Sequence, residues 1–560
     1  MARQIAVLAL LVLATPAWAA NPAEELLARV PAEATVHIVL QDVQRHWKTI
    51  QASPFAEWFI KSEFGINIQS EPTIKQLLNA EKSLPEALGL SSRQLLEGAI
   101  GPAVVLAYVP SASGDAVVLL TKSPKPATTI EFWKNLDAQQ LKSGEVSKLV
   151  PGTVGDVAFT ERLKPDGRAD YFAVLDNGLF VYTASKPVLE AVLKRNENSE
   201  APVLERFKHL ASKQEATRLL TVMIDPKSID KQLVVDEQAA GTADEKSFLQ
   251  QFRKLVGPMQ SVGFTLDVER DAEVSLRVAF DRIALPADFS PLLKSNRPTS
   301  SLWAGIPDKC LFSTAGRVEP DAVLPMMMSF LSKDSREKFE AMQRDVVGPV
   351  VGKTTLQQAA KGMEWALWVC PGSESGNWPA LSVAVRFIKT DKDKGNPLDG
   401  VLSGCDFVAQ MIRVQYNKSF DDGLKIEELK SGEFTYKTTK ANHLFPAGVQ
   451  PTYGLKRDVL VVSSHPSAWL DFDTKGNKAE PASLIARLNS DALVRELRGN
   501  RKAYAKLLAM LNGATAEKNE QSMPALIGTL ELFERVELHQ SVSGDVFSIS
   551  LKFQTKKPLK

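Results

Sequence analysis

A serine and a histidine that follow one another directly are the best candidates for chemistry in this sequence. Ser463-Ser464-His465 ends a stretch rich in β-branched residues, and Asp471 follows shortly afterwards. A hydroxyl, an imidazole and a carboxylate can serve a hydrolase as nucleophile, base and orienting acid. Sequence neighbours usually point apart, however, and no Gly-x-Ser-x-Gly turn is present to expose a nucleophile. We therefore expect a strand-to-helix turn here, and we keep Ser464, His465 and Asp471 as catalytic candidates.

The sequence offers no pattern typical of a metal or cofactor site. No pair of its six histidines has the spacing of a zinc site. Gly-x-Gly-x-x-Gly and phosphate-loop motifs are also missing from the sequence. We predict that the protein uses no metal and no cofactor.

Trp378 is the candidate binding contact. It lies in the turn-rich segment 372–379, whereas most other tryptophans lie within apolar patterns that are typical of a core. An exposed indole can stack on a sugar ring, so a carbohydrate-binding module is one hypothesis for the function.

The composition is that of a globular protein. The chain has 560 residues, of which 44% are hydrophobic and 24% charged, values close to the average for folded domains. These proportions exclude a disordered or collagen-like chain, and the length suffices for several cores.

The N-terminus predicts export. Arg3 precedes an apolar run over residues 5–13, and Ala17 and Ala19 supply the small residues that signal peptidases recognise. We expect residues 1–19 to be a cleaved signal peptide, and we expect a periplasmic or extracellular protein. No later stretch has the length of uninterrupted apolar sequence that a membrane span requires, so we expect no transmembrane segment after cleavage.

The net charge limits the class of partner that we expect, and the cysteine count limits the number of disulfides. The full chain has 67 basic and 66 acidic residues, and the signal segment contains one basic residue and no acid, so the mature chain has no net charge. A nucleic-acid partner is not expected. Cys310, Cys370 and Cys405 allow either one disulfide with a free thiol or three buried thiols.

Local patterns predict an α+β fold with a largely antiparallel sheet. Residues 171–175 and 179–183 are β-rich and flank Asn177-Gly178, a pair suited to a tight hairpin turn. A helix is expected over about 242–256, because Thr242 and Glu245 have capping-box spacing and Gly257-Pro258 ends the apolar stripe. Helices of this kind must cover at least one face of the sheet.

The order of these patterns occurs twice along the chain. Val30-Pro31 before the first expected strand corresponds to Ile306-Pro307, and residues 179–187 correspond to 459–466. We predict a tandem duplication of one α+β unit. The expected organisation is a signal peptide over 1–19, a first unit over 20–284, a proline-containing linker over 285–301 and a second unit over 302–560.

Two short motifs resemble a known group of proteins. The segment 30–40 and the hairpin at 178–185 are similar to pieces of large exported bacterial proteins that contain a domain of unknown function. The resemblance implies an exported chain of more than one unit, and it implies no activity or catalytic residues.

These observations favour a protein that binds and does not catalyse. We expect an exported binding, scaffold or surface-interaction protein of the cell envelope, whose partner is a protein or another envelope component. The alternatives are an envelope hydrolase with a dispersed Ser/His/Asp site and the carbohydrate-binding module.

Overall fold

The structure is a computed structural model of the whole chain. It describes residues 21–559 except for short stretches within that range, and the predicted signal peptide lies outside the described residues. The stretches left out are 73–74, 76–84, 86–88, 92–93, 95–96, 111–114, 197–200, 211–216, 294–299, 318–319, 343, 346–362, 373–377, 388–396, 422, 442–443, 447, 475–480 and 482.

Twenty strands form one sheet, and every pairing between described strands is antiparallel. Their spatial order is β4-β5-β6-β7-β3-β2-β1-β8-β9-β10-β20-β19-β18-β11-β12-β13-β17-β16-β15-β14. The α+β class and the largely antiparallel sheet predicted from the sequence are thereby confirmed. The strands are β1 (Val36–Gln41), β2 (Ala103–Val109), β3 (Ala116–Lys122), β4 (Lys148–Val154), β5 (Val157–Leu163), β6 (Ala169–Val174), β7 (Leu179–Thr183), β8 (Arg218–Ile224), β9 (Met259–Val268), β10 (Ala272–Phe280), β11 (Phe312–Arg317), β12 (Met363–Cys370), β13 (Ala380–Phe387), β14 (Lys425–Ser431), β15 (Phe434–Lys440), β16 (Thr452–Lys456), β17 (Val459–Ser463), β18 (Leu484–Asn489), β19 (Phe533–Ser543) and β20 (Val546–Thr555).

The strand pairings of the second half repeat those of the first in the same order. β3 pairs with β2 and β7, and β13 pairs in the same way with β12 and β17. The halves meet where β10 pairs with β20, from Ala272 opposite Phe553 to Ala279 opposite Val546. This shared order supports the predicted tandem duplication, which remains a prediction about the origin of the chain.

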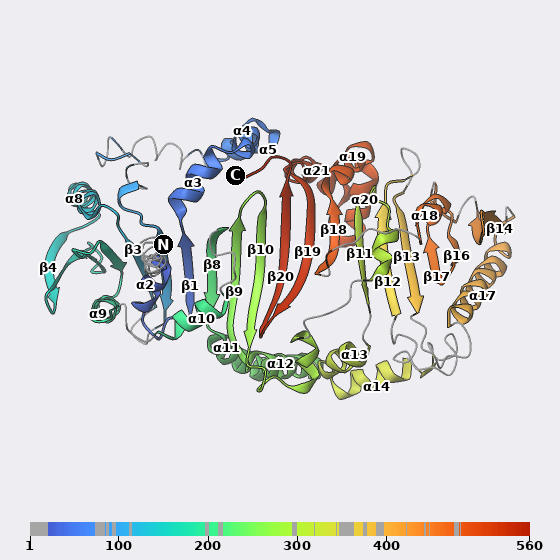
Figure 1. The fold of residues 1–560 in the computed structure, drawn as a ribbon, viewed down its shortest axis with the longest axis horizontal. Coiled ribbons are helices and arrows are strands. Elements are labelled where there is room, and N and C mark those ends of the chain that lie inside the picture. The colour runs from blue at the N-terminus through green and yellow to red at the C-terminus, as the bar shows by residue number, and fades with distance from the viewer. Residues whose placement is uncertain are drawn as a thin grey trace, which may run out of the picture.

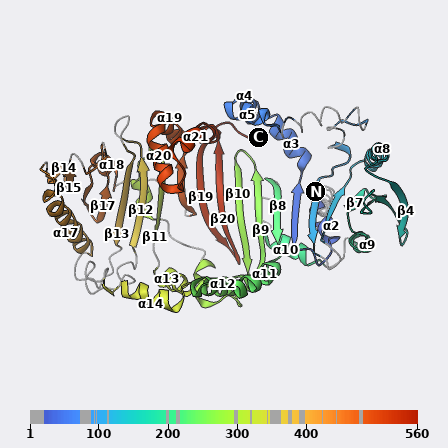
Figure 2. The same cartoon turned by 180° about the vertical axis from the view of Figure 1, so that it is seen from behind.

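Helices flank both ends of the strands and both ends of the sheet. Figure 1 shows α3–α5 near one set of strand ends and α11–α14 near the other, while Figure 2 shows the same arrangement from behind. The helices are α2 (Pro22–Ala28), α3 (Val43–Gln51), α4 (Pro54–Lys61), α5 (Glu63–Ser70), α8 (Pro126–Ser143), α9 (Lys186–Lys194), α10 (Pro202–Leu210), α11 (Pro226–Ala239), α12 (Ala243–Val256), α13 (Pro320–Ser329), α14 (Lys333–Met342), α17 (Pro397–Asn417), α18 (Pro466–Asp471), α19 (Ser490–Gly499), α20 (Arg501–Asn512) and α21 (Ala516–Leu530).

Local sequence accounts for the boundaries of several elements. Gly178 has a φ of 84° in the turn between β6 and β7, a backbone region that glycine enters without strain. The Thr242 side chain accepts a hydrogen bond from the Glu245 amide at 3.1 Å, which caps the first turn of α12. Both features agree with the sequence-based prediction.

The segment predicted as a linker is partly built into a core. Ala287–Leu293 forms a 3-10 helix, η2, and Leu285, Phe289 and Leu293 are buried beside Val278 and Phe280 of β10. Apolar side chains between the prolines explain this packing, since leaving them in water would forgo the free energy of their burial. Residues 294–299 of the predicted linker lie outside the described residues.

His37 on β1 is a buried histidine and gives a pH-dependent prediction. Burial, followed by the nearby Arg206, lowers the pKa of His37 from 6.5 to about 4, against the opposing effect of Asp225. The unfolded chain therefore binds a proton at His37 below about pH 6.5, whereas the folded chain binds that proton only below about pH 4. Stability that is fully present above pH 6.5 should fall by about 3 kcal/mol as the pH drops to 4.

We expect His37→Leu to reduce this acid-dependent loss, because leucine cannot take up a proton in either state. Urea unfolding of both proteins between pH 7 and pH 4 measures the difference in slope. Equal slopes for the two proteins would show that His37 does not control acid stability.

Candidate functional site

Ser464 and His465 lie in the turn between β17 and α18. The Ser464 hydroxyl is 2.8 Å from Nδ1 of His465, and it accepts a hydrogen bond from the Leu381 amide at 2.9 Å. Both contacts tie the end of β17 to the neighbouring strand β13 and to the start of α18. The hydroxyl thus has a structural role in the turn.

Asp471 does not complete a triad with these two residues. Its carboxylate forms an ion pair with the Lys309 ammonium at 2.6 Å, at the end of α18. His465 is buried, its pKa is lowered by burial, and among the described residues its Nε2 has no hydrogen-bond partner. The structure therefore brings Ser464 and His465 together without the carboxylate that would orient the imidazole.

Trp378 lies just before β13 and is partly buried. A partly buried ring presents less of its face than the open stacking platform that the sugar-binding hypothesis expects. The structure thus places the predicted contact just before the start of β13.

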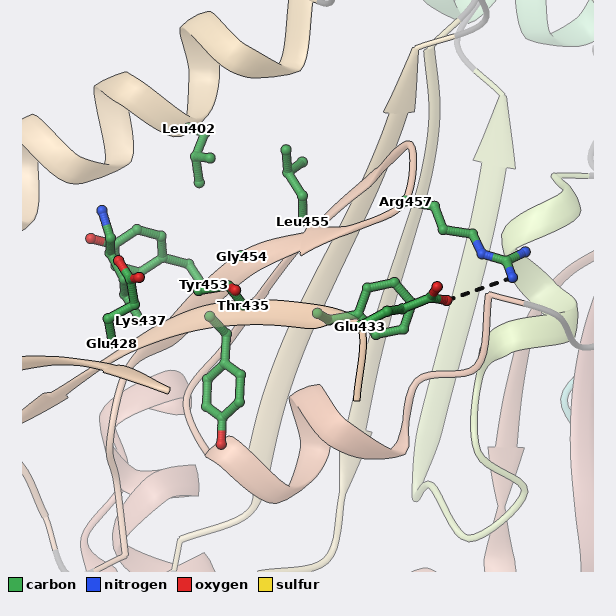
Figure 3. A pocket seen from close by; sticks show the side chains of 11 residues that line it. Leu402, Glu428, Glu433, Thr435, Lys437, Tyr453, Gly454, Leu455 and Arg457 are labelled. Carbon is green, nitrogen blue, oxygen red and sulfur yellow. Dashed lines mark ion pairs between the residues drawn. The ribbon is translucent and has the colours of Figure 1, made fainter. Parts of the chain in front are cut away.

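A cleft of about 540 Å³ lies between α17 and the strands β14–β16 at one end of the sheet. Leu402 on α17 faces it from one side, while Tyr453 and Leu455 on β16 face it from the other (Figure 3). Tyr453 and Leu455 share one face of their strand because strand side chains alternate. The same alternation places Thr435 and Lys437 of β15 in the cleft.

An ion pair attaches α17 to the floor of this cleft. The Lys437 ammonium is 2.8 and 2.9 Å from the two carboxylate oxygens of Asp406, and the Tyr453 hydroxyl donates to the same carboxylate at 2.8 Å. Burial raises the pKa of Tyr453 well above its ordinary value, and the bond to Asp406 adds to that effect. The phenol therefore stays protonated at neutral pH and donates a hydrogen bond to the Asp406 carboxylate.

The rim of the cleft carries further paired charges. Arg457 and Glu433 are 3.8 Å apart, as the dashed line in Figure 3 marks, and Glu428 lies opposite Lys437 in the strand register. Arg457 has a φ of 60°, a conformation that costs energy for a residue other than glycine. Two of the lining residues are basic and two are acidic, and the Asp406 carboxylate at the floor adds one more negative charge.

α17 leaves apolar side chains exposed on the side away from this cleft. Phe407 is 65% exposed and Met411 is 56% exposed. They contribute to a second opening of about 810 Å³, together with Val414, Phe420 and Leu444. α17 therefore has an apolar residue facing the cleft and an apolar surface facing solvent, as a helix at a binding region can have.

No sequence pattern indicated that Asp406, Lys437 and Tyr453 form a group. Asp406 lies 31 residues before Lys437 and 47 before Tyr453, and no motif links them. Their meeting depends on how α17 crosses the sheet.

Comparison with known proteins yields little that bears on this site. No family model matches the chain, and no curated protein matches its sequence. Among solved structures, a chain described as "Structure of crystal form I of TP0453" is 10% identical and has a TM-score of 0.22; the match covers 49% of this chain and 86% of that one. A likeness at this level does not indicate a function.

Neither a metal cluster nor a membrane-spanning helix is present among the residues that the structure describes. Within the described residues, His, Cys, Asp and Glu side chains form no group of three that could hold a metal ion. In that part of the chain, no helix is both long enough and apolar enough to cross a bilayer.

Proposed function

We propose that this chain is an exported, non-enzymatic binding protein of the cell envelope that holds a ligand in the cleft beneath α17. The cleft of about 540 Å³, with apolar side chains above and below, one ion pair at its floor and another at its rim, is the observation that carries the proposal. A volume of this size suits a small molecule or a side chain of a partner. Ser464 and His465, the catalytic candidates kept from the sequence, make contacts that hold a turn, and we propose no catalytic role for them.

A disulfide supports the export part of the proposal. Cys310 is bonded to Cys370, which lies at the end of β12, and Cys405 on α17 is a free thiol. Disulfides persist mainly in oxidising compartments outside the cytoplasm. The pairing thus fits the signal peptide predicted over residues 1–19.

Export predicts a processed N-terminus. The protein recovered from its native host should lack residues 1–19, because a signal peptidase would cut after the small residue Ala19. Intact-mass measurement, with and without reductant, reports both the cleavage and the disulfide. Recovery of the chain with Met1 from the cytosol would contradict export.

Binding in the cleft predicts a ligand that co-purifies with the protein. Leu455→Arg places a charged side chain on the apolar floor and should reduce the amount of bound ligand about tenfold, since an unpaired charge inside a cleft opposes apolar contact. The measurement is mass spectrometry of small molecules released by denaturing protein isolated from envelope extract.

Leu429→Arg is the matched control. Leu429 lies on β14 next to Glu428, so it faces the opposite side of the sheet from the cleft, and it is 36% exposed. This variant should keep the ligand at the wild-type amount. Equal retention by both variants, or no ligand on the wild-type protein, would contradict the proposal.

A further inference from the structure

The central strands of the sheet have apolar side chains on their exposed face and polar side chains on their buried face. Phe264 of β9, Val274 of β10 and Leu551 of β20 are 43%, 40% and 40% exposed. Thr265 and Ser275 follow the first two in the chain, so they point to the opposite face, where both are buried. A sheet with one solvated face ordinarily has the reverse pattern, with apolar residues inside and polar residues outside. Exposed apolar surface of this kind indicates a binding site.

The strand register joins these side chains into two rows that cross β1, β8, β9, β10, β20 and β19. Residues directly opposite one another on paired strands share a face of the sheet. The first row consists of Ile38, Val222, Phe264, Leu276, Ile549 and Gln540, and the second consists of Leu40, Leu220, Leu266, Val274, Leu551 and Leu538. None of these residues is buried, none is charged, and only Gln540 is polar. We call them the apolar rows.

The apolar rows have the length of a lipid chain. Neighbouring strands lie about 4.8 Å apart, so a row across six strands is about 24 Å long. Each leaflet of a bilayer contributes about 15 Å to a hydrocarbon core that is about 30 Å thick. An extended alkyl chain of a membrane lipid therefore fits along one row.

Helices pack against the same face around the apolar rows. The side chains that they contact are Tyr182 under α8, Lys437 under α17, Val278 beside η2 and Leu488 beside α19–α21. The strand pairings place all four on the face of the apolar rows. A helix with its side chains is about 10 Å across, so a flat bilayer or the face of a globular partner meets these helices first. A slender chain can lie between them.

The apolar rows offer no hydrogen-bonding groups to a peptide. Each of the six strands is paired on both sides, so its backbone donors and acceptors already have partners within the sheet. An extended peptide laid on this face would bury backbone polar groups without partners, which costs free energy. An alkyl chain has no such groups, and its methylenes gain free energy by leaving water.

We propose that the apolar rows bind the alkyl chain of a single lipid molecule. This site is separate from the cleft beneath α17 and goes beyond the function proposed for that cleft. The uncharged rows contact the chain, while the head group remains in water. The chain covers apolar side chains that the fold otherwise leaves exposed.

Chain length provides the first test. The probes are decyl-, dodecyl- and tetradecylphosphocholine, each kept below the concentration at which it forms micelles, and isothermal titration measures their affinity for the mature protein. We expect the affinity to rise at least about threefold for each two added carbons, because each methylene adds buried apolar area. Affinity that does not change with chain length would contradict the inference.

Charged substitutions within the apolar rows provide the second test. Val274 and Leu551 are directly opposite one another on β10 and β20, so Val274→Arg and Leu551→Arg each place a charge at the same point of the second row. Each should weaken dodecylphosphocholine binding at least about tenfold, since an unpaired charge opposes apolar contact. Val274→Thr keeps the shape without a charge and should stay within about threefold of wild type.

Ile283→Arg is the control, because Ile283 follows β10 and is 98% exposed, so it contacts little of the protein. This variant should keep the wild-type affinity, and the unfolding midpoint of each variant shows whether its fold is intact. Unchanged affinity in folded Val274→Arg and Leu551→Arg would overturn the inference.

Three further outcomes would assign the surface differently and overturn the inference. Binding that is weakened by Leu455→Arg and not by Val274→Arg would place the alkyl chain in the cleft, and the proposed function would stand. Sedimentation with phosphatidylcholine vesicles, without binding of the monomeric probes, would indicate a bilayer surface. A dimer in light scattering that Val274→Arg converts to a monomer, again without probe binding, would show that the apolar rows join two copies of the chain.

Discussion

Replacing Trp469 with alanine should lower the free energy of unfolding by about 3–5 kcal/mol, the usual range for removing a large buried aromatic side chain. Trp469 on α18 has no exposed surface, and its ring lies 4.6 Å from that of Tyr436. Its indole nitrogen also donates to the Val461 carbonyl at 3.2 Å. The substitution thus removes a stacking contact and a hydrogen bond and leaves a cavity.

The same change affects Lys456, whose ammonium lies 4.5 Å from the Trp469 ring. This ammonium donates to the carbonyls of Leu470 and Phe472 at the end of α18, and burial lowers its pKa to about 8. Loss of the ring removes one source of stabilisation for a buried cation. The loss of unfolding free energy in Trp469→Ala should therefore lie in the upper part of the range of about 3–5 kcal/mol.

Urea unfolding followed by circular dichroism measures this loss. Trp47→Ala is the control, because Trp47 on α3 is 51% exposed and its removal should change stability by only about 0.5 kcal/mol. Similar losses for the two variants would show that α18 contributes little to the stability of this end of the sheet.

Replacing Asp267 with alanine should also cost about 3–5 kcal/mol, because it removes a carboxylate that pairs with a buried guanidinium group. Arg218 on β8 is 2% exposed and lies 3.3 Å from the Asp267 carboxylate on β9. Arg277 on β10 is close by: burial, followed by repulsion from Arg218, lowers its pKa, and Asp267 opposes that shift. Without Asp267, its carboxylate no longer offsets the repulsion between Arg218 and Arg277.

A double variant distinguishes the cost of an unpaired charge from loss of packing. Arg218→Met combined with Asp267→Leu removes both charges and should recover most of the stability, since apolar side chains can replace a buried ion pair. Glu57→Ala breaks an ion pair with Lys61 whose side chains are 74% and 72% exposed, and it should leave stability unchanged. If the double variant loses as much unfolding free energy as Asp267→Ala, the loss comes from packing and not from an uncompensated charge.

Features set by neighbouring residues could be predicted from the sequence. The Asn177-Gly178 hairpin and the Thr242 cap depend on side chains within a few positions of each other, and the structure has both. The turn at Ser464 was also expected, although the contact between its hydroxyl and the His465 ring was not. Adjacent residues can meet when a strand ends and the backbone changes direction.

Features set by distant residues could not be predicted in the same way. The burial of Phe289 within a predicted linker depends on β10 and on Phe547 of β20 lying beside it. The pairing of Asp406 with Lys437 depends on the path of α17 over β15. Neither the apolar pattern nor the turn residues contain this information.

The sequence by itself determined the α+β class, the alternation of strands and helices and the repetition of their order, because these follow from side-chain periodicity and turn chemistry over a few residues. Only the tertiary structure decided that β10 and β20 join the two halves into one sheet. It also decided that Leu402 of α17 and Tyr453 of β16 line one cleft. A cavity is a difference in volume between surfaces that pack together, so it exists only once the helix and the sheet are in place.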